Sequence, residues 1–158
     1  MKFLLLLLGL LTFGCASSPQ NNEETSKINN SQVYRYSYDN VWRATQVALQ
    51  AYPIKVNNSE KGIIHTEFIE DGEIWTHPTQ KQRSNVRYQL KIRAIRGVIR
   101  SKPAIKIAID KILRKQKNFI EGSSEESSRD YLEEAVLLYR IKRELIIDHA
   151  LNKLQQKE

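Results

Sequence analysis

The side chains suited to acid–base catalysis or metal binding are few in this sequence and lie far apart. His65, His77 and His149 fall in a predicted strand, loop and helix, without the short spacing at which neighbouring ligands share a metal ion. Glycine-rich phosphate loops and the nucleophile-elbow motif are missing from the sequence as well. A Ser/His/Asp triad stays open, because its members meet only in the fold. The sequence otherwise predicts no catalytic residue, no metal and no cofactor.

Four acids bracket a predicted turn in the first half of the chain: Glu67, Glu70, Asp71 and Glu73. Two carboxyl groups held close together could serve as a general acid and a general base. Acids at a turn are also the ordinary composition of a solvated loop. We adopt the second interpretation and expect a protein that is not an enzyme.

The clearest chemical pattern is a separation of charge along the chain. The formal net charge is +7, and residues 81–117 hold thirteen Lys or Arg with a single acid. Residues 121–134 hold six acids and one base. A basic segment of this kind can face a nucleic acid, an anionic membrane or an acidic protein.

Arg87, Lys91, Arg93 and Lys106 should project from one outward face of a predicted sheet, because alternate residues of a strand share a face. This surface could meet lipid phosphates or an acidic protein. The alternative is a solvated sheet face, partly neutralised by the acidic segment.

The first fifteen residues have the three parts of an export signal. Lys2 gives a positive start, residues 3–11 form an apolar core, and the small residue Gly14 precedes Cys15. The apolar run is too short to cross a bilayer as a permanent helix, which takes ~20 residues. Export makes a nucleic-acid partner improbable. Cys15 is the only cysteine, so no intramolecular disulfide can form.

Gly14-Cys15 resembles the end of the lipobox of bacterial lipoproteins, although Thr12 and Phe13 depart from its usual residues. The resemblance implies that residues 1–14 are removed and that Cys15 is lipidated. In such lipoproteins a residue other than Asp after the cysteine, here Ala16, is associated with sorting to the outer membrane. An ordinary secretion signal with an incidental cysteine is the alternative.

Residues 15–32 are rich in Asn, Ser, Gln and Glu and predict a disordered tether, and residues 33–158 predict one domain. Apolar periodicity and turn residues divide this domain into strands and helices. The expected elements are a strand at 33–38, a helix at 39–52, strands at 54–56, 63–69, 86–94 and 104–110, and a helix from 128 to about 155. This order predicts an α+β fold in which four to five antiparallel strands pack on two helices.

Two features of the domain could serve a partner. Trp75 lies in the middle of a long loop, where it can pack on the domain or face a partner or lipid interface. The last helix carries two apolar stripes, one including Tyr139, Ile146 and Leu154 and the other including Leu138, Ile141 and Leu145. So apolar a helix either packs deeply on the sheet or contacts another protein.

Residues 38–67 resemble the start of a helix-grip domain in BamC-like lipoproteins, subunits of the outer-membrane β-barrel assembly machinery. The match rests on a tryptophan-bearing helix at 38–49, a strand at 54–56, and Lys61-Gly62 before a second strand. The chain departs from that family in having one such domain where two are typical. The resemblance implies a non-catalytic binding or scaffold subunit in envelope assembly, with an envelope protein as its partner. The alternative is a carrier that holds a lipid or small apolar ligand between sheet and helix.

Overall fold

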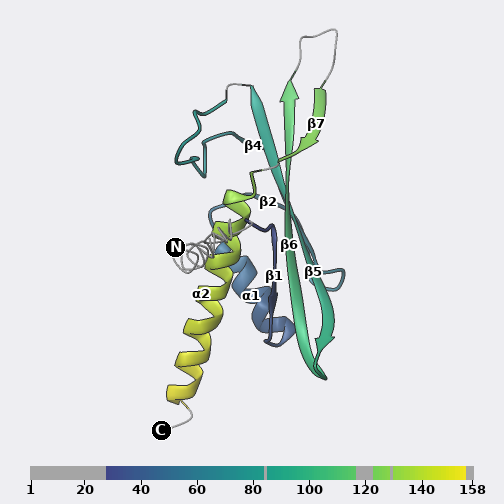
Figure 1. Cartoon of the computed structure of the whole chain (residues 1–158), viewed down its shortest axis with the longest axis vertical. Helices are drawn as coiled ribbons and strands as arrows, with labels where there is room; N and C mark the ends of the chain where they lie inside the picture. Colours follow the sequence, from purple (N-terminus) through teal and green to yellow (C-terminus); the bar gives the residue numbers. More distant parts are fainter. Residues whose placement is uncertain (1–27, 84, 117–122, 129, 156–158) are drawn as a thin grey trace, which may run out of the picture.

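The computed structural model describes residues 28–83, 85–116, 123–128 and 130–155, which form an antiparallel sheet with two helices on one face (Figure 1). The strands are β1 (Ser31–Tyr34), β2 (Ile54–Asn58), β3 (Ile63–Thr66), β4 (Ile69–Glu70), β5 (Val86–Ile99), β6 (Lys102–Gln116) and β7 (Ser123–Ser127). The helices are α1 (Tyr38–Ala48) and α2 (Leu132–Gln155). The predicted α+β class and long C-terminal helix are confirmed. The leader at 1–14 and Cys15 lie outside the described residues.

A long hairpin of β5 and β6 is the centre of the sheet. Arg100 and Ser101 form its turn with φ of 50° and 60°, as a two-residue type I′ turn requires. Each long strand is paired on its outer edge by two short strands in succession, β5 by β3 and β4, and β6 by β1 and β7. The sheet therefore contains seven strands, with β4 and β7 added to the four or five expected.

The core lies between the hairpin and α2. Side chains alternate along β5, so Tyr88, Leu90 and Ile92 point inward and are fully buried. They pack in one cluster with inward residues of β6 and with α2. The buried members from those elements are Ile105, Ile107, Ile109, Leu113, Leu137, Leu138, Ile141 and Leu145. Periodicity could not rank the two apolar stripes of α2, and the stripe with Leu138, Ile141 and Leu145 is the packed one.

Helix α1 completes the layer beside α2. Ser37 caps its first turn, its hydroxyl accepting a hydrogen bond from the backbone N–H of Asn40 at 3.4 Å. Trp42 is buried in the core and stacks on Tyr38 with ring centroids 5.8 Å apart. Arg43 joins the two helices through an ion pair of 2.6 Å to Asp148.

Gly62, between β2 and β3, occupies a position that only glycine fits. Its φ is +65°, in the left-handed region. Its carbonyl accepts a hydrogen bond of 2.7 Å from the backbone N–H of Ala94, and a Cβ added here would collide with the Ala94 carbonyl oxygen. The glycine therefore allows the turn to lie directly against β5.

Residues 123–127, for which the sequence predicts neither a strand nor a helix, form β7. This strand pairs with β6 in register, and the pairing is reinforced by ion pairs from Arg114 to Glu125 and from Lys115 to Glu126. Helix α2 begins at Leu132, four residues later than the expected 128, and Asp130 Oδ1 accepts a hydrogen bond of 3.1 Å from the Leu132 backbone N–H.

Candidate functional site

The three histidines lie apart in the structure. His65 stands on β3 opposite Lys91, and His149 on α2 contacts the Tyr36 ring edge-on at 6.4 Å. Among the described residues, no group of three or more His, Cys, Asp or Glu side chains is arranged to hold a metal ion.

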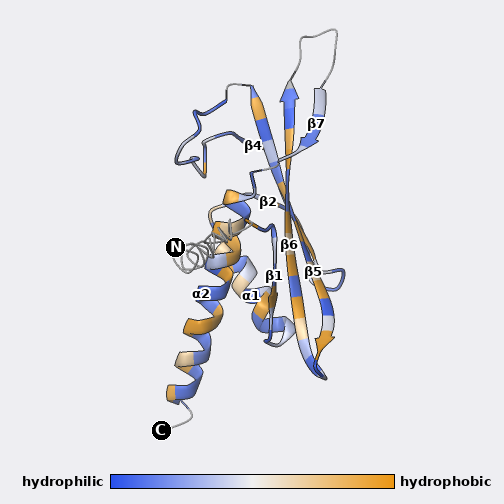
Figure 2. Cartoon of the chain, viewed as in Figure 1, coloured by the Kyte–Doolittle hydropathy of each residue, from blue (hydrophilic) through white to orange (hydrophobic). Residues whose placement is uncertain are grey.

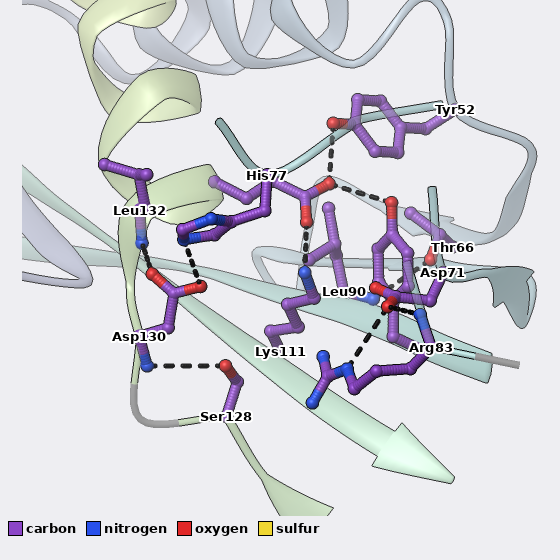
Figure 3. Close-up of polar contacts among 12 residues, drawn as sticks. Tyr52, Thr66, Asp71, His77, Arg83, Leu90, Lys111, Ser128, Asp130 and Leu132 are labelled. Carbon is purple, nitrogen blue, oxygen red and sulfur yellow. Dashed lines mark hydrogen bonds and ion pairs between the residues drawn. The ribbon is translucent and has the colours of Figure 1, made fainter. Parts of the chain in front are cut away.

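His77 connects the loop between β4 and β5 to the start of α2. Its Nδ1 accepts hydrogen bonds from the backbone N–H groups of Thr79 and Gln80 at 3.1 and 2.9 Å. Its Nε2 lies 3.2 Å from Asp130 Oδ2 and therefore carries the proton donated to that carboxylate (Figure 3). Both ring nitrogens are engaged, so this histidine holds the loop in place.

Beneath this loop lies a buried polar cluster centred on Glu133, in the first turn of α2. Its Oε1 accepts hydrogen bonds from the hydroxyls of Tyr52 and Tyr88 at 2.8 and 2.9 Å, and its Oε2 from Lys111 Nζ at 2.6 Å (Figure 3). Burial raises the pKa of both tyrosines above the usual range, and Glu133 adds to the shift. The hydroxyls therefore stay protonated and donate to the carboxylate.

Glu134, the next residue, is also buried, and its Oε1 has no hydrogen-bond partner among the described residues. Burial raises its pKa to about 7, although a hydrogen bond to its own backbone and the positive charge of Lys111 offset part of the effect. Neither carboxylate was singled out from the sequence. The signal that could have found the cluster is the inward register of β6, in which Lys111 lies between Ile109 and Leu113.

Trp75 forms part of the wall of a pocket above this cluster. Its ring is half-buried, meets the His77 ring edge-on at 5.5 Å and lies 5.2 Å from Lys111 Nζ. The pocket is also lined by Asp71 and Arg83, which pair at 3.2 Å. Acidic and basic side chains thus both line the pocket, and Trp75 packs against its own domain.

The four basic residues singled out from the sequence share the sheet face that the helices leave uncovered. The pairing register sets Lys91 opposite Asp110, and Lys106 opposite Ile95. Arg87 and Arg93 each have an acidic neighbour, Arg87 binding Glu70 at 3.4 Å and Arg93 binding Asp110 at 3.0 Å. Lys106 forms no ion pair within the part of the chain that the structure describes.

Lys106 lies at the middle of a row that crosses three strands. Val33 of β1 and Ile95 of β5 are its direct neighbours in the register, and their exposed fractions are 45% and 49%. We call Val33, Lys106 and Ile95 the sheet-face row. Two large apolar side chains beside a lysine without an acidic neighbour suit a protein partner that offers apolar surface and an acid.

The apolar stripe of α2 that includes Tyr139, Ile146 and Leu154 is exposed on the side away from the sheet. We call it the outer stripe, and its members are Tyr139, Ile146, Ile147, Leu151 and Leu154, with exposed fractions of 64%, 53%, 39%, 54% and 63%. Figure 2 shows hydrophobic residues along α2 down to its C-terminal end. No helix of the described residues is long and apolar enough to cross a membrane.

Compared with known protein families and with curated proteins, the chain matches no family model and no curated sequence.

Proposed function

We propose that this protein is a periplasmic lipoprotein, anchored to the outer membrane through Cys15, whose domain acts as a non-catalytic binding subunit in envelope assembly. The tether is shorter than the predicted 15–32, because Ser31 and Gln32 belong to β1 and pair with β6. Its part before β1 gives the domain reach from the membrane. Its sheet binds an envelope protein through the face that the helices leave open.

The observation that carries the proposal is the sheet-face row. The pairing register places the exposed aliphatic side chains of Val33 and Ile95 on either side of Lys106 on the outward face of the sheet. Exposed apolar residues that cluster, rather than scatter singly, are typical of interaction sites. Nearby arginines are neutralised by acids of the same face, so Lys106 is the charge most available to a partner.

The packing of the core supports a binding subunit over a carrier. Tyr88, Leu90 and Ile92 of the sheet, and Leu137 and Ile141 of α2, are each at most 1% exposed. Side chains fill the space between sheet and helix at these positions, where a carried ligand would have to lie. A protein interior is packed as densely as an organic crystal, so admitting a lipid here requires the layers to separate.

A pull-down from detergent-solubilised envelopes tests the proposal. The full-length protein is compared with Ile95→Glu and with Ile146→Glu, which puts the same charge at a similarly exposed residue on α2. We expect the unaltered protein and Ile146→Glu to recover the same envelope protein and Ile95→Glu to lose it. Circular dichroism confirms that both variants fold.

Loss of the recovered protein from both variants, or from neither, contradicts a binding site on the sheet face. A lipid that co-purifies with a monomer and survives Ile95→Glu supports the carrier instead.

A further inference from the structure

The C-terminal part of α2 extends beyond the domain core. The last buried residue of the helix is Leu145, and from Ile146 to Gln155 every residue is exposed except the half-buried Asp148. Ten residues correspond to about 15 Å of helix, which projects past α1 in Figure 1. The burial of Leu137, Leu138, Ile141 and Leu145 anchors this projecting segment to the core.

Apolar residues gather on one side of the projecting segment. At about 100° per residue, Ile146, Ile147, Leu151 and Leu154 fall within an arc of about 140°. Tyr139 continues the arc towards the core. Free aliphatic surface of this extent is unfavourable in water, so it indicates a partner.

Basic residues outnumber acids along the arc. Arg140, Lys142, Arg143 and Lys153 are all exposed within or beside the outer stripe. Glu144, which is half-buried, lies at the edge of the stripe, about 20° beyond Leu151 on the helical wheel. Asp148 lies behind the stripe and is neutralised by Arg43 of α1 at 2.6 Å. The outward side of α2 is therefore apolar and positive, with one acid, Glu144, at its edge.

This combination distinguishes between possible partners. A second copy of the helix would set Arg140, Lys142, Arg143 and Lys153 against the same four cations, and Glu144, the one acid at the edge of the stripe, is too few to offset them. The helix is not apolar enough to span a bilayer. A helix with a polar side, a row of Ile and Leu and flanking Lys and Arg has the composition of one that lies in the headgroup region of an anionic membrane.

We propose that the outer stripe of α2 rests on the surface of an anionic membrane. Its aliphatic side chains enter the headgroup region, and the flanking Lys and Arg meet lipid phosphates. The inference rests on the proposed function for the anchor that brings α2 to the membrane. It orients the domain with its helices towards the lipid and the sheet-face row towards the periplasm.

Lipid-borne quenching of a site-specific fluorophore tests the inference in the full-length chain. An environment-sensitive label is placed on Leu151→Cys or, as the control on the sheet face, on Ile95→Cys, and the chain with Cys15 alone gives the background. The protein is reconstituted in vesicles of phosphatidylcholine with or without phosphatidylglycerol, and nitroxide-bearing lipids serve as quenchers. We expect a blue shift and quenching at position 151 on anionic vesicles, and neither at position 95.

Charge reversal provides a second measurement. The Arg143→Glu/Lys153→Glu variant should weaken the partitioning of position 151 onto anionic vesicles, measured by the quenching, by about thirtyfold, since each of the two basic residues near an anionic surface contributes roughly 1 kcal/mol. Lys91→Glu/Lys106→Glu makes the same change in charge on the sheet face and should leave quenching at position 151 unchanged.

Each outcome either supports or overturns the inference. A blue shift at position 151 without lipid quenching assigns the outer stripe to a protein partner or a second copy, and overturns the membrane inference. An unshifted spectrum at position 151 overturns it too. Mass spectrometry of the same sample reads the acyl group on Cys15 separately. Quenching without that acyl group contradicts the anchor alone, whereas an acylated chain without quenching contradicts the membrane-facing helix alone.

Discussion

Lys111 Nζ lies 2.6 Å from Glu133 Oε2, and both side chains are almost completely buried. This ion pair joins the middle of β6 to the first turn of α2. Because Glu133 also accepts hydrogen bonds from Tyr52 and Tyr88, one carboxylate connects three parts of the fold. The cluster thereby fixes the direction in which α2 leaves the sheet.

Removing the cation should destabilise the domain strongly. Lys111→Met keeps most of the side-chain volume but leaves the Glu133 carboxylate buried without its counter-charge, and breaking such a pair typically costs about 3–5 kcal/mol of unfolding free energy. Urea denaturation measures it. The exposed Lys106→Met serves as control and should change stability by less than about 0.5 kcal/mol. Equal effects of the two substitutions contradict a structural role for the pair.

Stability should fall as the pH rises towards neutrality because of Glu134. Its folded pKa of about 7 lies above the ordinary 4.5, so between these pH values the folded state holds a proton that the unfolded state has lost. The contribution of this group is full below about pH 4.5 and is lost as pH passes 7, for a total of about 3 kcal/mol.

Urea denaturation at pH 5 and pH 8 checks this dependence. Glu134→Gln removes the titration and should flatten the difference between the two pH values, whereas Glu60→Gln, at an exposed position, should not. Identical pH profiles for the unaltered protein and Glu134→Gln would show that burial does not raise the pKa of the Glu134 carboxyl.

The turn at Gly62 should not accept a side chain. Gly62→Ala combines a left-handed backbone with a collision against the Ala94 carbonyl, and we expect a loss of about 2 kcal/mol or more. Gly97→Ala is the matched control, since a Cβ there meets its nearest atom at an ordinary 3.8 Å. Thermal unfolding of both variants decides the point, and a Gly62→Ala protein as stable as Gly97→Ala refutes the predicted strain.

The sequence could predict those strands and helices in which apolar residues recur with a single clear spacing. Alternation along β5 and β6 located the central hairpin, and a single apolar face located α1. β7 was missed because Ser123–Ser127 contains only serine and glutamate, which have weak strand preference. Its pairing is reinforced by Arg114 and Lys115 of β6, so the signal for this strand lies in the basic residues of its partner strand.

The candidate surfaces were only partly predictable, because periodicity shows which residues share a face but not which neighbours contact them. Register alone places Arg87, Lys91, Arg93 and Lys106 on one face, but the acids that neutralise two of them come from β4 and β6. For α2, both stripes have helical spacing, and only the packing of the sheet selects which one is buried. The Glu133 cluster joins four segments, at Tyr52, Tyr88, Lys111 and Glu133, and of these only the inward position of Lys111 on β6 gives a signal in the sequence.

The leader sequence predicts, independently of the domain's structure, that Cys15 is lipidated. Cells grown with a clickable fatty-acid analogue should label the protein, and Cys15→Ala should abolish the label because no other thiol is present. A labelled Cys15→Ala protein, or an unlabelled native one recovered in soluble form, contradicts the anchor.

Photo-crosslinking in intact cells shows directly whether the domain is a binding subunit with two oriented faces. A photoreactive amino acid replaces Ile95 on the sheet face or Ile146 on α2, two positions of similar exposure. We predict a discrete crosslinked protein from position 95 and none from position 146, which we propose rests on lipid. A protein crosslink from position 146, with none from position 95, would contradict it.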